Sequence, residues 1–269
     1  RISCSPDHRF AVMSGLKLEW KKIKELSPGD FIATADVFSP LGKSPGGDAN
    51  AGYLLGLLIG DGFYNDARGF SISASVHEPD WIATCEESII RVFGDKIREN
   101  LHRYRHKTSR GGECCAVTVH NADARRSLLV LGLETVSKED KYIPPWIFTA
   151  SPDIRAAVVA GLFDSDGGAR HYEINGYSQY DVDFSSRVEH LAVGVHLLLS
   201  SLGIESSCRA YDATVEREKD GVIVGEEPTK QYKVRVTYRG FKKFQELVKL
   251  RHDRKRLCLE KVATEIGDR

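Results

Sequence analysis

The chain has 269 residues, and its 38 Lys and Arg balance 38 Asp and Glu, so its formal net charge is zero. Hydrophobic residues make up 41% and charged residues 28%, a globular composition that excludes a disordered or low-complexity chain. No apolar run reaches the roughly 18 residues of a membrane span, so we expect no membrane partner. With no signal-peptide pattern and no C-x-x-C pair, we expect an intracellular protein, in cytoplasm or nucleoid, with reduced cysteines.

The first segment, residues 1–38, predicts a small all-β unit. Phe10–Met13, Leu16–Trp20 and Phe31–Thr34 predict strands, and Ser27-Pro-Gly-Asp30 has the composition of a turn between strands. Residues 39–50 are rich in Pro, Gly and Ser, which indicates a linker and a domain boundary.

Residues 51–150 predict a first half-domain that opens with a helix capped by Asp48. Alternating apolar and polar residues predict a half-buried strand over 70–76, and further strands are expected over 96–106 and 113–120. Two more helices are expected over 78–93 and 121–131, the second capped by Asn121.

Residues 151–269 repeat this order, beginning at a helix with Ser151 as its N-cap and Pro152 at its first position. The remaining expected elements are strands over 170–174, 179–185, 205–215 and 231–239, helices over 188–202 and 241–250, and a charged loop over 216–229. The fold class is therefore α+β, with two pseudo-symmetric αββαββα halves whose antiparallel sheets form a saddle-shaped surface.

One nine-residue pattern occurs at the start of each half. Residues 54–62 read Leu-Leu-Gly-Leu-Leu-Ile-Gly-Asp-Gly, and residues 159–167 read Val-Ala-Gly-Leu-Phe-Asp-Ser-Asp-Gly. The small residues within each copy are four apart, a spacing that places them on one helical face and lets two helices approach closely. The Gly that ends each copy favours a left-handed helix terminus. Parallel packing would bring Asp61 and Asp166 together, where two carboxylates repel unless they bind cations.

This pair of motifs resembles the LAGLIDADG motif of homing endonucleases, in the form with two copies per chain. The resemblance implies a site-specific, metal-dependent endonuclease that makes a double-strand break in DNA at a long asymmetric target. It implies Asp61 and Asp166 as catalytic, metal-binding residues for Mg²⁺ (or Mn²⁺), with the carbonyls of Gly60 and Ser165 as further ligands. The resemblance also implies double-stranded DNA as the partner, and the protein is expected to be a monomer. The first motif has Ile59 where the family usually has Asp.

The same resemblance implies a lysine near the scissile phosphate in each half. The text Lys-x-Ile-Pro identifies it as Lys141 in the first half, and we choose Lys255 in the second, with Lys233 as a competing candidate.

Polar faces of the strands predict the DNA-binding residues. In the strand over 231–239, Gln231, Lys233 and Arg235 alternate with apolar residues, and Arg, Lys and Gln read base edges in the major groove. The basic residues cluster in two places, over 96–110 and 230–256, which predicts a basic groove despite the zero net charge. The full set of expected DNA contacts is Ser71, Ser73, Ser75, Arg98, His102, Tyr104, Gln231, Lys233, Arg235, Thr237 and Arg239.

The N-terminal text is similar to an intein splicing domain (Hint domain). In Ser5-Pro-Asp-His8, Ser5 takes the position of a Thr and His8 that of the histidine that activates the scissile peptide bond in that family. A splicing nucleophile upstream and a terminal His-Asn pair are missing, so we expect that this chain cannot splice alone. It is interpreted as an intein-encoded nuclease with a partial splicing segment, or as a free-standing descendant.

Two alternatives remain open from the sequence. The first is an RNA-binding maturase, which needs the same fold without both carboxylates. The second is an intein fragment whose nuclease is inactive. A plain scaffold protein is disfavoured by the double motif.

Overall fold

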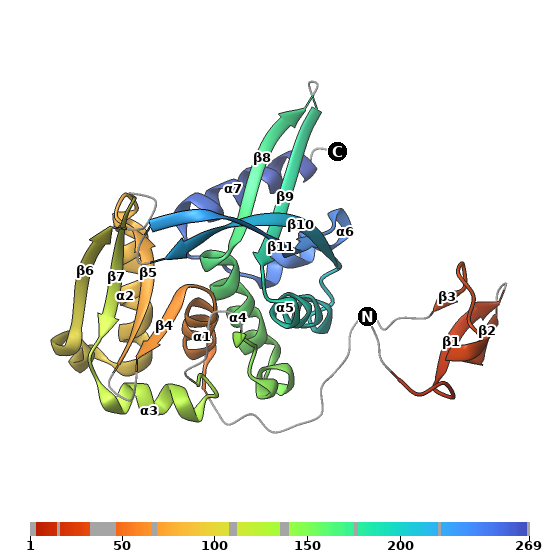
Figure 1. Ribbon diagram of the computed structural model, residues 1–269, viewed down its shortest axis with the longest axis horizontal. Helices are drawn as coiled ribbons and strands as arrows, with labels where there is room; N and C mark the ends of the chain where they lie inside the picture. Colours follow the sequence, from red (N-terminus) through yellow and green to blue (C-terminus); the bar gives the residue numbers. More distant parts are fainter. Residues whose placement is uncertain are drawn as a thin grey trace. The chain divides into compact units, whose positions relative to one another are not determined.

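Figure 1 shows the computed structural model of the chain. It describes residues 4–14, 17–32, 47–65, 69–107, 112–134, 140–174, 177–219 and 222–267. The chain divides into two compact units, Arg1–Val37 and Phe38–Arg269. Residues 39–46 of the expected linker lie outside the described part of the chain.

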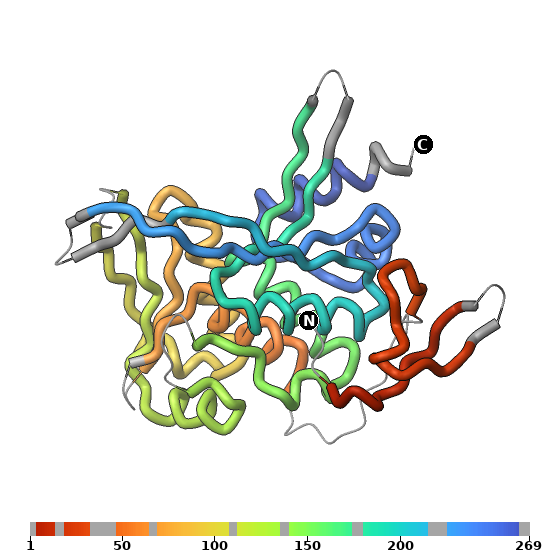
Figure 2. Tube along the Cα trace, turned by 45° about the vertical axis from the view of Figure 1, so that its right-hand side comes forward, coloured from red at the N-terminus to blue at the C-terminus, as the bar shows by residue number. Residues whose placement is uncertain are grey.

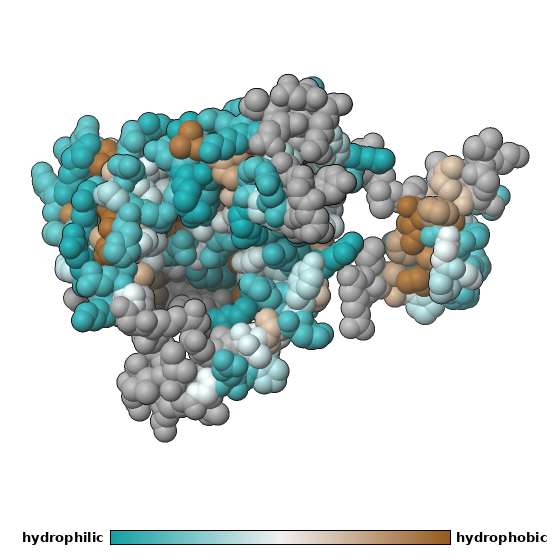
Figure 3. Space-filling model, turned by 90° about the horizontal axis from the view of Figure 1, so that it is seen from above, coloured by the Kyte–Doolittle hydropathy of each residue, from teal (hydrophilic) through white to brown (hydrophobic). Residues whose placement is uncertain are grey.

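The smaller unit is an antiparallel sheet in the order β2-β1-β3. Its elements are β1 (Arg9–Ser14), β2 (Lys17–Lys22), the 3₁₀ helix η1 (Ile23–Glu25) and β3 (Phe31–Ile32). The strand pairing puts Met13, Trp20 and Phe31 on one face, where their exposed fractions are 40%, 70% and 76%. This unit therefore presents an apolar sheet face to solvent, visible as the hydrophobic patch in Figure 3.

The larger unit contains the same succession of elements twice. The first half comprises α1 (Ala49–Asp61), β4 (Gly62–Asn65), β5 (Gly69–Ser75), α2 (Pro79–Phe93), η2 (Asp95–Asn100), β6 (Leu101–Lys107), β7 (Glu113–Val119), α3 (Ala122–Val130) and η4 (Pro145–Thr149). The second half comprises α4 (Pro152–Ser165), β8 (Gly167–Ile174), β9 (Tyr177–Ser186), α5 (Glu189–Ser201), β10 (Ser206–Lys219), β11 (Val222–Val236), α6 (Tyr238–Leu247) and α7 (Asp253–Gly267).

Both halves have one sheet topology. The strands run β4-β5-β7-β6 in the first sheet and β8-β9-β11-β10 in the second, and all described pairings are antiparallel. Helices α1 and α4 lie between the two sheets (Figure 1). The expected α+β class and the αββαββα order are thus confirmed, with α7 as an additional helix that the sequence analysis did not anticipate.

The core explains why the two motif helices carry so few polar residues. Every residue of α1 from Gly52 to Gly60 is buried, and so are most of those in α4. A helix that is apolar on all sides is stable only when it is surrounded, here by the partner helix and the sheets. The caps are those expected, because Asp48, Asn121 and Ser151 accept hydrogen bonds from backbone amides in the first turns of α1, α3 and α4.

Three boundaries differ from the sequence expectations. Strand β6 begins at Leu101 rather than at residue 96, because the residues before it form η2; Arg98 therefore lies outside the strand, where it pairs with Asp95. The expected charged loop over 216–229 belongs to β10 and β11 in its described residues, which form a long hairpin (Figure 2). Strand β11 ends at Val236, so two of the DNA contacts predicted on this strand lie outside it.

Those two residues are Thr237 and Arg239. Thr237 is the N-cap of α6, and its side chain accepts a hydrogen bond from the amide of Gly240. Arg239 lies in the first turn of α6. Neither continues the alternating polar face of β11, because a capping residue stops the strand where the helix starts.

The six cysteines are free thiols, as predicted, and Cys115 is buried while its neighbour Cys114 faces the other side of β7. Among the described residues, no helix is both long and apolar enough to cross a bilayer.

Candidate active site and sheet surfaces

The candidate site starts from the contact between α1 and α4, where backbones touch without intervening side chains. A Cβ atom added to Gly56 would lie 2.9 Å from the Cα of Gly161, closer than real Cβ atoms approach other atoms. One turn further along, a Cβ on Gly60 would lie 2.7 Å from the Cβ of Ser165. The small residues at four-residue spacing therefore bring the two helix axes close, as the motif pattern predicted.

This contact places Asp61 and Asp166 at the same end of the helix pair. Asp61 is the last residue of α1, and Asp166 is the C-cap of α4. The Oδ2 atom of Asp166 is 3.4 Å from the position that a Cβ on Gly60 would take, so the second carboxylate lies against the first helix.

The electrostatics of Asp61 reflect this neighbour. Burial raises the pKa of Asp61 to about 6, and the negative charge of Asp166 adds to the rise, while Lys141 and Lys255 oppose it. Burial also raises the pKa of Asp166, again against the two lysines. Two carboxylates and two ammonium groups thus form one electrostatic cluster.

Both predicted lysines lie at this end of the helix pair. Lys141 donates to the carbonyl of Gly60. The Nζ of Lys255, which lies in α7, donates to the carbonyls of Phe163, Asp164 and Ser165 at 3.0, 2.6 and 3.0 Å. Burial lowers the pKa of Lys255. The competing candidate Lys233 lies elsewhere, on β11, paired with Asp183.

The helices end differently from the expectation. Gly62 has φ −78° and ψ 146°, an extended conformation, and the described glycines with positive φ do not include Gly62 or Gly167. The predicted left-handed terminus is therefore wrong. Space is the reason for glycine, since a Cβ on Gly62 would lie 2.6 Å from the Cα of Leu58, and one on Gly167 would lie 2.6 Å from the Cα of Phe163. Glycine lets each strand turn back directly against its own helix.

The donor set of the site is compatible with a hard divalent cation. It combines the carboxylates of Asp61 and Asp166 with the carbonyls of Gly60 and Ser165, all oxygen donors of the type that Mg²⁺ accepts. Within the described ranges, no group of three or more His, Cys, Asp and Glu side chains could hold a metal ion. Any further oxygen ligands would therefore come from water or from a bound phosphate, as is usual for Mg²⁺.

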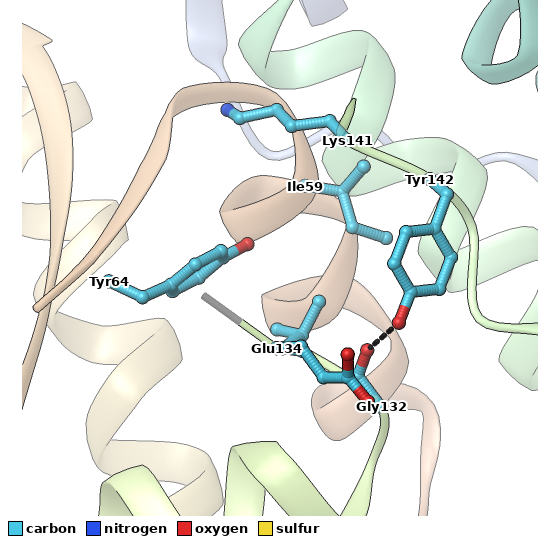
Figure 4. Close-up of a pocket in the computed structure, with 7 residues that line it drawn as sticks. Ile59, Tyr64, Gly132, Glu134, Lys141 and Tyr142 are labelled. Carbon is cyan, nitrogen blue, oxygen red and sulfur yellow. Dashed lines mark hydrogen bonds between the residues drawn. The ribbon is translucent and has the colours of Figure 1, made fainter. Parts of the chain in front are cut away.

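A pocket lies beside Lys141 in the first half. Its empty volume is about 220 Å³, which includes space open to solvent. Figure 4 shows Tyr142 donating to the carbonyl of Gly132 at its rim. The lining residues are Ile59, Tyr64, Gly132, Leu133, Glu134, Lys141 and Tyr142. Lys141 is half-buried beside this pocket, whereas Lys255 in the second half is 5% exposed.

The first sheet brings five of the predicted DNA contacts to one face. Ser71 on β5 and His102 on β6 both pair with Thr118 on the strand between them, β7. Ser73 and Tyr104 both pair with Ala116 in the same way. Ser75 shares this face by alternation along β5. Tyr104 also hydrogen-bonds His120 at 3.2 Å, and both rings pack near His102.

The second sheet brings Gln231, Lys233 and Arg235 to one face, alternating with buried Val234 and Val236. The sequence analysis missed two acids among them. The Oδ2 of Asp183 is 3.2 Å from Lys233 and also pairs with Arg170, while Asp181 lies 2.7 Å from Arg235. Both acids are nearly buried, so the basic side chains are held against the sheet. The alternation of these acids with Val182 and Phe184 along β9 was the available signal.

His8 lies in the smaller unit, exposed, with its ring 5.1 Å from that of Phe10.

Comparison with known families assigns part of this architecture. Residues 153–249 match the model of the LAGLIDADG-like domain. The match includes Asp166 and the strand that carries Gln231, Lys233 and Arg235. It does not include the first motif.

Comparison with known proteins gives distant relatives. The chain is 28% identical over 274 residues to the ATP-dependent DNA helicase Hel308 of Methanocaldococcus jannaschii, which covers 97% of the chain and 20% of that protein. It is 28% identical over 224 residues to protein RecA of Mycobacterium tuberculosis, covering 80% of the chain and 26% of that protein. It is 26% identical over 244 residues to the replicative helicase DnaB of Rhodothermus marinus, covering 88% and 24%. The chain spans only about a fifth to a quarter of the length of these relatives.

Among solved structures, mesophilic variants of the homing endonuclease I-DmoI match with a TM-score of 0.47 and 15% identity over 74% of this chain and 94% of theirs. The homing endonuclease I-WcaI bound to its DNA recognition sequence matches with a TM-score of 0.44 and 14% identity, over 77% and 85%. The match to the LAGLIDADG-like family model is confined to residues 153–249, which include the second motif and most of the second half.

Proposed function

We propose that the protein is a site-specific DNA endonuclease that breaks both strands of a duplex by phosphodiester hydrolysis. The observation that carries this proposal is the position of Asp61 and Asp166 at the same end of the touching helices α1 and α4. The charge of Asp166 acts on the pKa of Asp61, which supports a single electrostatic site.

In this proposal Asp61 and Asp166 hold divalent cations together with the carbonyls of Gly60 and Ser165. A bound Mg²⁺ or Mn²⁺ would supply charge neutralisation at the phosphate and a more acidic water. Lys141 and Lys255 stabilise negative charge that develops during the reaction. The two lysines come from opposite halves of the larger unit and donate to the carbonyls of Gly60 and Ser165, which directly precede the two acids, and this supports one lysine for each strand.

The two exposed sheet faces would bind DNA. Ser71, Ser73, Ser75, His102 and Tyr104 come from the first sheet, and Gln231, Lys233 and Arg235 from the second. Both halves lie in one chain, so a monomer supplies both acids. Double-stranded DNA is the partner, and the protein acts where that DNA is, in the cytoplasm or nucleoid.

The test is cleavage of a plasmid library that contains randomised target sequences, with and without Mg²⁺. We expect magnesium-dependent linear products from a small set of sites. Asp61→Asn and Asp166→Asn should each reduce cutting to a nick, in opposite strands. Full double-strand cutting by either variant would remove that acid from the mechanism. Binding of RNA without DNA cleavage would favour the maturase alternative.

We also propose that the nuclease belongs to an intein. The support is the text around His8, the exposed apolar face of the small sheet, which a larger splicing domain would cover, and the comparisons. A helicase, a RecA and a DnaB protein share a similar segment that makes up only 20–26% of each, as a mobile insert would. The test is ligation of flanking peptides when terminal splicing segments of a related intein are supplied; absence of ligation, with the segments folded, would contradict it.

A further inference from the structure

The position two residues before the terminal acid differs between the two motifs. It is Ile59 in the first and Asp164 in the second. Asp164 is 1% exposed, and its Oδ1 has no hydrogen-bond partner among the described residues. Burying a carboxylate in this way has a cost that an isoleucine avoids. Asp164 therefore needs a role that offsets the free-energy cost of burying its carboxylate.

The other carboxylate oxygen joins three parts of the larger unit. The Oδ2 of Asp164 accepts a hydrogen bond from the Tyr53 hydroxyl at 2.7 Å and from the Arg251 amide at 2.6 Å. Tyr53 belongs to α1, and Arg251 lies just before α7. The guanidinium of Arg251 stacks 4.0 Å above the Tyr53 ring and reaches Asn50 at 3.1 Å. Asp164 is thus the point at which α1, α4 and the approach to α7 meet.

This junction lies directly beside Lys255. Arg251 is four residues before Lys255, and the Lys255 ammonium donates to the backbone carbonyl of Asp164 itself at 2.6 Å. The side chain of Asp164 therefore fixes the start of α7, while its main chain receives the lysine that α7 carries. Both contacts act on the same short segment.

The first half holds its lysine in another way. Lys141 donates to the carbonyl of Gly60, and the carbonyl of Leu58 accepts from the Tyr64 hydroxyl at 2.6 Å. The equivalent carbonyl in the second half is that of Phe163, which accepts from Lys255. Ile59 provides no carboxylate for a corresponding junction.

We propose that Asp164 is a positioning residue that holds Lys255 over the end of α4, and that it acts on the strand served by the second half alone. This inference rests on the proposed nuclease function for its effect on cleavage. The position of Lys255 can also be measured without DNA.

The first experiment is amine acetylation footprinting of the full chain, with the modification of each lysine followed by mass spectrometry. Asp164→Ile, which copies the first motif, should raise the reactivity of Lys255 by about tenfold or more and leave Lys141 unchanged. Asp164→Asn keeps a side-chain oxygen that can accept both hydrogen bonds, so Lys255 should stay protected. Ile59→Val is the matched change in the first half and should also leave Lys255 protected.

The second experiment follows nicking of each strand of the target duplex. Lys255→Met identifies the strand that depends on this lysine. Asp164→Ile should slow the same strand about 10–100-fold, because small displacements of catalytic groups cost this much, and change the other strand less than about threefold. Tyr53→Phe removes one of the two hydrogen bonds and should act in the same direction if Asp164→Ile does not fold.

Equal slowing of both strands, or an unchanged Lys255 reactivity in both Asp164→Ile and Tyr53→Phe, would overturn the proposal. Failure of the wild-type protein to cut DNA would instead contradict the proposed function. The footprint would still decide the positioning role in that case.

Discussion

Gly56 and Gly161 face each other across the contact of α1 and α4, and a Cβ on either one would lie 2.9 Å from the Cα of the other. No side-chain rotation can relieve this overlap, since the atoms in the way belong to the backbone. The two helices would have to separate, and the carboxylates at their ends would move with them.

Gly56→Ala should therefore destabilise the protein by about 1–3 kcal/mol, the usual cost of overpacking, measured as the free energy of unfolding in urea. Gly194→Ala is the matched control within α5. The three atoms nearest to its Cβ would all belong to the Ile143 side chain, the closest at 3.2 Å, and alanine is more favourable than glycine in a helix by about 1 kcal/mol. A Gly56→Ala protein as stable as Gly194→Ala would contradict the close helix contact.

Metal binding should depend on pH through Asp61. A carboxylate must lose its proton before it can bind a cation, and the pKa of Asp61 is raised to about 6. The apparent affinity for Mn²⁺ should thus be constant above this pH and fall as pH drops below it. Calorimetric titration in buffers of different ionisation enthalpy measures both the affinity and the protons released.

Asp166→Asn supplies the control for this pH dependence. It removes the negative charge that helps to raise the pKa of Asp61, so the inflection should move to lower pH. An inflection that stays in place would show that the two carboxylates do not interact.

Without metal, the free energy of unfolding should change with pH in the opposite direction to the metal affinity. The pKa of Asp61 is about 6 in the folded protein against an ordinary value of 3.8, so the folded state keeps its proton longer than the unfolded state. Stability should therefore decrease as pH rises from about 4 to 6 and remain lower above that range. Asp61→Asn should be more stable than the wild type at pH 7 in EDTA by about 1–2 kcal/mol, after a discount for partial solvent screening. Near pH 4 the difference should vanish, and urea unfolding at both pH values checks this.

Arg235 should contribute to discrimination between DNA base pairs. The loss of this contact must be separated from the loss of the ion pair with Asp181. Arg235→Gln would remove the positive charge that pairs with the nearly buried carboxylate of Asp181, and this destabilises the sheet. The double variant Asp181→Asn, Arg235→Gln removes both charges together. We expect it to fold normally and to lose about 1–3 kcal/mol of discrimination at one or two base pairs of the selected target.

Salt dependence provides the accompanying measurement. Wild-type affinity for DNA should fall steeply as salt increases, because phosphate neutralisation releases counterions. Binding that does not change with salt would contradict a basic sheet surface, whatever the effect of the double variant.

The sequence predicted the larger unit well where the signal is local. The alternation at 70–76, the caps Asp48, Asn121 and Ser151, and the paired motifs gave the element order of both halves. Sequence patterns report which face of an element is buried, as the alternation over 70–76 does for β5. The motif helices are buried on all sides, and the spacing of their small residues identified them instead.

Other features needed spatial neighbours. The outer part of the β10–β11 hairpin, over residues 216–229, was interpreted as a charged loop, because its sequence shows no alternation of apolar and polar residues. Thr237 was assigned to a strand although its hydroxyl caps α6, since a threonine fits either role until the following helix is visible.

By itself, the sequence determined that two helices with small residues at four-residue spacing pack together and that each ends at an Asp. Spacing along a helix fixes which residues share a face. Only the tertiary structure decided how the lysines are held. Lys141 and Lys255 come from segments far from the motifs in the chain, and Asp164 gains its partners from α1 and from the segment before α7. Such contacts depend on long-range packing, which no local pattern of residues records.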